Sequence, residues 1–339
     1  MAALFHHLCR IFNMLSKPRD ATLEEVPVLD LSEAATFEGR RNLACILRKA
    51  AVDTGFFYIR NHGISAGQLE GVFDASRRYF ALPLEARMGD LVDNVTRRGY
   101  SPMSASQQDG FHPDLKESYD FGYDLPADDP DVVAGLFGHG PNKWPDHFPD
   151  FQKRIAPYID AVLGEAKTLF RLFAISLDAP EDYFTRHLNK PMMQTRLMHY
   201  PPQSSLTQDD VFGTAPHVDI GFITILAQDP IGGLELQKKD GEWVSAPHLD
   251  GTFVVNLGDL FKRVSNDIYS STYHRVVNRS GRQRYSIPSF INLDYHTPVS
   301  CLESCIVPGD VAHYPPVTSG EVLESTLRHY EVALENGAY

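Results

Sequence analysis

The sequence predicts an α+β protein with a mostly helical first half and a β-rich second half. In the first half, apolar residues recur with the three-four spacing that is typical of amphipathic helices. After about Thr195, short β-branched and aromatic runs recur at the intervals expected of a β-sandwich or barrel. The 339 residues contain no internal repeat and no low-complexity tract. We therefore expect the two halves to form one cooperative unit.

Residues 33–53 predict the first helix, because four apolar residues fall on one stripe. These are Leu43, Ile46, Leu47 and Ala50. Gly55 is expected to end this helix, and the run FFYI at 56–59 predicts a strand directly after it.

Two further helices are predicted before residue 190. Ser65 and Gln68 have the spacing of a capping box, so a helix is expected to begin there. Residues 146–177 have the most regular apolar spacing and predict the longest helix. The segment 99–148 between them is rich in Gly, Pro, Asp and Ser, and we expect long loops with short strands.

The second half is predicted to contain short strands followed by a helix. The expected strands are 195–200, 222–228, 234–237, 243–246, 252–257, 272–278, 284–292 and 305–308. Asp240-Gly241 is typical of a hairpin turn. Thr318 and Glu321 again have capping-box spacing, which predicts a C-terminal helix.

Charge and composition exclude several classes of protein. Lys and Arg number 31 against 44 Asp and Glu, a net charge of −13. An acidic chain without a basic cluster is not expected to bind nucleic acid or anionic membranes. No apolar run approaches the roughly 18 residues of a membrane span.

The N-terminal residues 1–25 are expected to be disordered or an extension. A weak organelle presequence and a true start at Met14 remain open alternatives. The four cysteines fit a reducing compartment, so a cytoplasmic location is expected. Cys301 and Cys305 are interpreted as ordinary buried thiols, since a single C-x3-C lacks the second pair of a zinc site.

Histidine followed two residues later by aspartate occurs at His112/Asp114, His217/Asp219 and His248/Asp250. The spacing alone is weak evidence. The first pair lies in a loop-rich stretch and the third runs into a glycine turn. The second precedes a β-branched run, and on extended backbone side chains two positions apart point the same way. His217 and Asp219 can therefore face one metal ion.

A third ligand is expected from another strand, and His274 lies in the β-like run STYHRVVN. Two histidines and one carboxylate form the facial triad of non-heme Fe(II) oxygenases, although catalytic zinc sites also use three protein ligands. Ten residues later, Arg284 and Ser286 share one strand face. A guanidinium with a hydroxyl is a suitable receptor for a carboxylate.

With these residues in place, the sequence resembles the isopenicillin N synthase-like branch of the 2-oxoglutarate and Fe(II)-dependent dioxygenases. The resemblance begins near Val26 and rests on segments that occur in the same order as in the family. These are VPVLDLS, DTGFFYIRNHGI, KESYDFGYDLP, GPNKWP, HVDIGFITILAQDPIGGLELQ, GTFVVNLGDLF, STYHRVVN and RYSIPSFIN. It implies a double-stranded β-helix, or jelly roll, flanked by helices. The implied division is an N-terminal region at 26–190, a catalytic core at 191–317 and a C-terminal helix at 318–339.

The resemblance implies that His217, Asp219 and His274 are the iron ligands. It implies that Arg284 and Ser286 bind the distal carboxylate of 2-oxoglutarate.

Tyr200 matches a tyrosine that commonly helps to hold 2-oxoglutarate in the family. Met198 stands where many relatives have Asn. The strands that carry these motifs also offer residues for the substrate site, namely Arg196, Phe222, Phe290 and Asn292. For Arg196, a salt bridge within the barrel is an equal alternative.

The implied activity is oxidation of a small organic molecule with O2, in which 2-oxoglutarate yields succinate and CO2. Hydroxylation is expected first, in specialised metabolism, with desaturation, cyclisation and ring expansion left open. Ascorbate is a possible reductant. Two alternatives stay open: an Fe(II) oxidase that does not use 2-oxoglutarate, and a non-catalytic jelly-roll binding protein. The sequence leaves the substrate and the oligomeric state undetermined.

Overall fold

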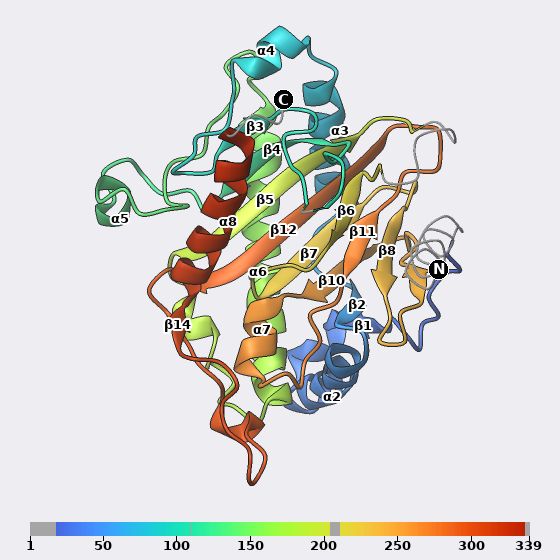
Figure 1. Cartoon of the computed structure of the whole chain (residues 1–339), viewed down its shortest axis with the longest axis vertical. Helices are drawn as coiled ribbons and strands as arrows, with labels where there is room; N and C mark the ends of the chain where they lie inside the picture. The colour runs from blue at the N-terminus through green and yellow to red at the C-terminus, as the bar shows by residue number, and fades with distance from the viewer. Residues whose placement is uncertain (1–17, 109, 204–210, 336–339) are drawn as a thin grey trace, which may run out of the picture.

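A jelly roll of two sheets forms the centre of the computed structural model, which describes residues 18–108, 110–203 and 211–335 (Figure 1). In sheet order, the larger sheet contains β1 (Val28–Asp30), β2 (Phe56–Arg60), β10 (Thr252–Leu257), β7 (Ile223–Gln228), β12 (Arg284–Asp294), β5 (Pro191–Tyr200), β4 (Glu117–Gly122) and β3 (Gly99–Ser101). The smaller sheet contains β6 (Thr214–His217), β11 (His274–Val276), β8 (Leu234–Gln237) and β9 (Trp243–Ser245). The α+β prediction is confirmed.

Strands β5 and β12 run side by side along most of their length at the centre of the larger sheet (Figure 1). Their antiparallel register sets Arg284 opposite Tyr200 and Ser286 opposite Met198. Antiparallel partners lie about 4.5–5.5 Å apart, so residues from separate sequence motifs become neighbours.

The smaller sheet begins with a short pairing of β6 and β11, in which His217 lies opposite His274. Next to them, β8 and β9 form the predicted hairpin. Gly241 in its turn has φ +88°, a conformation that favours glycine. The predicted strand at 272–278 is shorter than expected, because only three of its residues pair.

Three helices cover the outer face of the larger sheet and form the main core with it. They are α2 (Phe37–Asp53), α3 (Ala66–Phe80) and α6 (Phe151–Ser176). The capping box at Ser65 and Gln68 forms as predicted. On the predicted stripe of α2, Leu43, Leu47 and Ala50 are buried, whereas Ile46 is 42% exposed. A 3-10 helix (Leu31–Ala35) precedes α2, and Thr36 between them caps α2.

Helix α6 begins at Phe151 and not near residue 146 as predicted. Pro149 explains the difference, because proline disfavours helical backbone at the residue before it. The helix otherwise matches its prediction. Gly55 ends α2 with φ +67°, and a β-carbon there would lie 2.3 Å from the carbonyl oxygen of Ser270.

The predicted strand at 305–308 is wrong. The chain forms a 3-10 helix over Glu303–Cys305 and then turns. Pro308 has no N–H to donate to a strand partner, and Gly309 follows it in the left-handed region. The Cys305 side chain is buried in the main core, as predicted, whereas Cys301 is only half-buried; both are free thiols.

The C-terminal helix α8 (Ser319–Glu335) crosses in front of the larger sheet (Figure 1). The predicted capping box forms there, because Thr318 N–H donates to the Glu321 carboxylate and Glu321 N–H donates to the Thr318 hydroxyl. The remaining short elements are α4 (Leu84–Met88), α5 (Pro130–Val133), a 3-10 helix (Thr185–His187), α7 (Asp259–Val264), β13 (Pro298–Val299) and β14 (Val317–Thr318). The segment 99–148 consists of long loops with short strands, as predicted.

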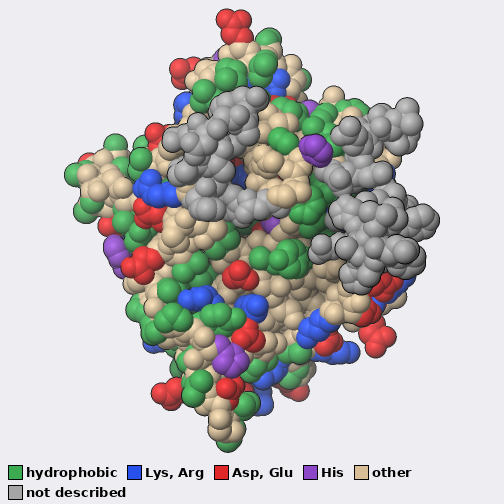
Figure 2. Space-filling model, viewed as in Figure 1, with side chains coloured by type: hydrophobic (Ala, Val, Ile, Leu, Met, Phe, Trp, Pro, Cys, Tyr) green, Lys and Arg blue, Asp and Glu red, His purple; other side chains and the backbone are tan. Residues whose placement is uncertain are grey.

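Acidic and basic side chains are interspersed on the face shown in Figure 2, and the described residues in view form no continuous basic patch. Among the described helices, none is long and apolar enough to cross a membrane. The boundaries at residues 25, 190 and 317 stay predictions, and Met1, Met14 and Cys9 lie outside the described residues.

Candidate active site

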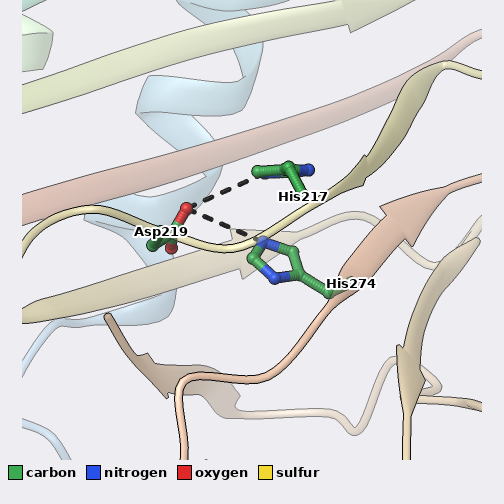
Figure 3. A group of neighbouring side chains, drawn as sticks. All are labelled: His217, Asp219 and His274. Atoms are coloured by element: carbon green, nitrogen blue, oxygen red, sulfur yellow. Dashed lines mark ion pairs between the residues drawn. The ribbon is translucent and has the colours of Figure 1, made fainter. Parts of the chain in front are cut away.

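His217, Asp219 and His274 converge where β6 ends and β11 begins (Figure 3). His217 ends β6, Asp219 lies two residues beyond it, and His274 begins β11. Each offers one ligand atom, and these atoms lie within 4.8 Å of one another. In the described part of the chain, this is the one group of three or more such residues that could hold a metal ion.

One carboxylate oxygen of Asp219 faces both imidazoles. Its Oδ1 lies 3.8 Å from His217 Nε2 and 3.7 Å from His274 Nε2. Two metal–ligand bonds of about 2.1 Å span up to about 4.2 Å, so each of these atom pairs can share one ion.

Hydrogen bonds orient all three side chains toward this common point. His217 Nδ1 lies 2.8 Å from the carbonyl oxygen of Ala215, and His274 Nδ1 lies 3.1 Å from that of Thr272. A histidine that donates from Nδ1 keeps the Nε2 lone pair available for a metal.

The other oxygen of Asp219, Oδ2, accepts two hydrogen bonds. Thr224 donates from its hydroxyl at 2.5 Å, and Asn256 donates from its side-chain amide at 2.7 Å. These bonds leave Oδ1 for the metal. Neither residue was a site candidate from the sequence. Their sequence positions carry no metal-ligand spacing.

Burial opposes ionisation of Asp219, but the two imidazoles and the hydrogen bonds from Thr224 and Asn256 lower its pKa below the ordinary value. Burial, followed by the neighbouring His274, lowers the pKa of His217. An ionised carboxylate and a neutral imidazole are the forms that bind metals.

Arg284 and Ser286 lie together on β12, as their spacing predicted. Both are buried, and Arg284 donates from Nη1 to the Ser286 hydroxyl at 3.0 Å. The guanidinium also donates from Nε to the carbonyl oxygen of Gly232. Its Nη2 is buried with no hydrogen-bond partner. A buried guanidinium nitrogen without a partner is costly, and an anionic ligand would remove that cost.

Tyr200 lies against the same guanidinium, whose central carbon is 4.6 Å from the ring centroid. The Tyr200 hydroxyl donates to the sulfur of Met198 at 3.3 Å. Met198, opposite Ser286, therefore contributes an acceptor to this cluster, at the position where many relatives have asparagine.

A cavity of about 690 Å³ opens beside the metal ligands and is lined by residues from β4, β5, β12, α8 and the loop before β4. Its volume is within the range of about 300–1,000 Å³ that is common for small-molecule sites. His217 and Asp219 form part of its wall. Leu323 and Leu327 of α8 add an apolar wall.

Three of the four predicted substrate residues line this cavity: Arg196, Phe290 and Asn292. Arg196 also forms the alternative salt bridge, donating to both oxygens of Asp120 at 2.7 and 2.9 Å.

Phe222 was predicted for the same cavity, and that prediction is wrong. Its side chain is fully buried and packs edge-on against Phe261, with centroids 5.1 Å apart. The backbone N–H of Phe222 donates to Asn292 Oδ1 at 2.8 Å. This hydrogen bond fixes the backbone so that the Phe222 side chain points into the part of the core that faces the helices. Gly221 makes this close approach possible, since a β-carbon there would lie 2.1 Å from Asn292 Oδ1.

Arg98, directly before β3, is 2% exposed. Its guanidinium donates to backbone carbonyl oxygens, including those of Thr96 and Gly138 at 2.6 and 3.1 Å. The third His-x-Asp pair forms a turn, as expected, with His248 Nε2 3.0 Å from Asp250 Oδ1.

Comparison with known proteins matches two family models to this chain. Residues 26–147 match the N-terminal domain of non-haem dioxygenases in morphine synthesis, and residues 191–293 match the 2OG-Fe(II) oxygenase superfamily. The chain is 35% identical over 311 residues to the 2-oxoglutarate-Fe(II) type oxidoreductase hxnY of Emericella nidulans, covering 89% of each chain. It is 31% identical over 296 residues to Kihadalactone A synthase LFS of Citrus sinensis, covering 84% of this chain and 87% of the relative.

A similar solved structure is full-length Neurospora crassa T7H in complex with alpha-KG and thymine, with a TM-score of 0.79 and 27% identity. The match covers 90% of this chain and 96% of that one. The printed descriptions of hxnY and of the T7H complex, together with the family match, favour 2-oxoglutarate use over the oxidase and over the non-catalytic alternative. This chain belongs to the 2-oxoglutarate and Fe(II)-dependent oxygenase superfamily and is an oxidoreductase that uses Fe(II) and 2-oxoglutarate.

Proposed function

We propose that His217, Asp219 and His274 are the Fe(II) ligands of this oxygenase. One observation carries the proposal: both histidine Nε2 atoms and Asp219 Oδ1 face one point, while the other polar atoms of the three side chains are hydrogen-bonded elsewhere. The ligand set of two nitrogens and one oxygen suits Fe(II) and leaves positions open for cosubstrate and O2.

Arg284 and Ser286 bind the distal carboxylate of 2-oxoglutarate in this proposal. The partnerless Arg284 Nη2 and the Ser286 hydroxyl are the available donors. Tyr200 borders the cosubstrate through its ring and hydroxyl. Burial of this cluster excludes water, which strengthens a charge-assisted hydrogen bond.

The substrate is a small organic molecule held in the 690 Å³ cavity. When bound, Fe(II) and 2-oxoglutarate supply the oxidising chemistry, with succinate and CO2 as co-products. The protein orients one C–H bond of the substrate toward the metal end of the cavity, between Phe290, Asn292 and Arg196. Hydroxylation in specialised metabolism is the proposed outcome. The position of the substrate decides among this and desaturation, cyclisation or ring expansion. We also propose a cytoplasmic location.

Anaerobic titration of the Fe(II)-loaded protein with 2-oxoglutarate tests this assignment. A saturable visible charge-transfer band is expected for the wild type. The band should be lost in His217→Ala, which removes a metal ligand, and should need higher 2-oxoglutarate in Arg284→Ala. Iron binding without a band would contradict the cosubstrate site, whereas failure to bind iron would contradict the metal site.

A further inference from the structure

Asp114 is a wholly buried carboxylate that the proposed metal and cosubstrate sites do not use. It belongs to the first His-x-Asp pair and lies in the loop before β4. Its Oδ1 accepts from the Ala215 N–H at 2.8 Å. Its Oδ2 accepts from the Ser106 hydroxyl at 2.9 Å and forms an ion pair with Lys116 Nζ at 2.8 Å. Asp114 thus joins the loop to β6, two residues before His217.

Lys116 extends from this pair to the wall of the substrate cavity. Its ammonium group also donates to the Thr214 hydroxyl at 3.3 Å. An ammonium has three N–H donors, so one remains after Asp114 and Thr214. The side chain is 11% exposed. Lys116 lines the same cavity as His217 and Asp219, so a substrate bound there could accept a hydrogen bond from the remaining N–H.

Other charged side chains in these walls also have partners. Arg196 is paired with Asp120 through two hydrogen bonds. Glu117 is paired with Arg87 and lies 2.7 Å from His199 Nδ1. Arg98, which also lines the cavity, donates to the carbonyl oxygens of Thr96 and Gly138. A substrate carboxylate would therefore lose its hydration and meet cations whose donors are already engaged, which is unfavourable. An uncharged oxygen acceptor loses less on burial.

We propose that Lys116 is a specificity-determining residue that donates a hydrogen bond to an uncharged oxygen acceptor of the substrate, and that Asp114 positions and neutralises it. The substrate class is then a largely apolar, neutral organic molecule with a carbonyl, ester or hydroxyl oxygen near the oxidised carbon. This inference rests on the proposed function of the site, because it requires the substrate to occupy the cavity beside the metal ligands.

A panel of matched compounds tests the inference on the Fe(II)- and 2-oxoglutarate-loaded enzyme. Each pair consists of a methyl ester and its free carboxylic acid on the same aromatic or alicyclic scaffold. The measurement is the concentration that half-maximally stimulates succinate release. We expect esters to act at concentrations about tenfold lower than their acids, the factor that 1.4 kcal/mol produces.

The variant Asp114→Asn tests the role of Asp114 directly, because it leaves the Lys116 ammonium without its carboxylate partner. The asparagine can still accept from the Ala215 N–H through Oδ1. The preference should move toward the acids in this variant. The double variant Lys116→Met/Asp114→Asn removes both charges together, so neither remains buried alone. It should raise the half-maximal concentration of esters about tenfold, as loss of a charge-assisted hydrogen bond predicts.

Lys190→Met is the matched control, since Lys190 is also ion-paired, with Asp129 and Asp131, but does not line the cavity. It should keep the ester preference. The inference is overturned if wild type prefers acids, if no ester stimulates succinate release, or if Asp114→Asn leaves the preference unchanged. A weaker 2-oxoglutarate titration in the double variant would assign Lys116 to the cosubstrate instead. If the wild-type charge-transfer band is absent, the proposed function fails separately.

Discussion

His217 and His274 are direct cross-strand partners on the antiparallel strands β6 and β11, with ring centroids 4.2 Å apart. The register of one strand pair therefore brings together two imidazoles that are 57 positions apart in the sequence. Asp219 completes the group from the segment just after β6. Because a metal here would connect the two strands, its binding should stabilise the smaller sheet as well as supply chemistry.

Replacing a proposed metal ligand should abolish that stabilisation. We expect Fe(II) to raise the Tm of the wild type under anaerobic conditions and to leave the Tm of His217→Ala unchanged. His248→Ala is the control, because it belongs to another His-x-Asp pair that forms a turn. Calorimetry with metal analysis measures both effects. Equal metal-dependent Tm shifts in His217→Ala and wild type would contradict the ligand assignment.

The Arg284 side chain should determine affinity for 2-oxoglutarate. Arg284→Gln removes the charge and the unpartnered Nη2, so the Kd for 2-oxoglutarate should rise about tenfold to a hundredfold, from the 1.5–3 kcal/mol of a hydrogen bond to a charged group. Titration of the visible band measures the Kd. Arg282→Gln, at an exposed position two residues earlier, should leave it unchanged. A normal Kd in Arg284→Gln would place the cosubstrate elsewhere.

Asn256 should act on the metal through the orientation of Asp219. Asn256→Ala removes the 2.7 Å hydrogen bond to Asp219 Oδ2, and loss of such a bond typically lowers metal affinity about tenfold to a hundredfold. Competition with a metal indicator measures the affinity. Thr252→Val, on the same strand with its hydroxyl bonded to the carbonyl oxygen of Leu249, is the control. Unchanged affinity in Asn256→Ala would show that Thr224 alone orients the carboxylate.

Glu165 should make stability depend on pH. Burial in α6 raises its pKa to about 7. The folded state thus holds this proton more tightly than the unfolded state, so stability falls as pH rises from the ordinary glutamate pKa through about 7.

Glu165→Gln removes this dependence. We expect the variant to become more stable than the wild type as pH rises from 5 to 8, by about 1 kcal/mol after allowing for solvent screening of this partly exposed group. Urea unfolding at each pH measures the difference. Asp160→Asn, at an exposed position of the same helix, is the control. A constant difference across the pH range would contradict the prediction.

Local patterns predicted much of the fold correctly. The capping pairs at Ser65 and at Thr318 involve residues three positions apart, and both formed. The strand periodicity of two also predicted that Arg284 and Ser286 share a face. Errors arose where a proline interrupted an otherwise regular local pattern. Because of Pro149, α6 begins later in the sequence than predicted, and Pro308 prevents the predicted strand at 305–308.

The sequence by itself determined which of the proposed site residues share a direction, because His217 and Asp219, like Arg284 and Ser286, lie two positions apart on extended backbone. Only the tertiary structure decided which other side chains join them. Asn256 reaches Asp219 through strand pairing, Phe222 turns into the core, and Lys116 is held at the cavity wall by Asp114. These contacts connect residues that are from 2 to 39 positions apart. The long-range contacts arise from the pairing of separate strands and loops, which local periodicity does not encode.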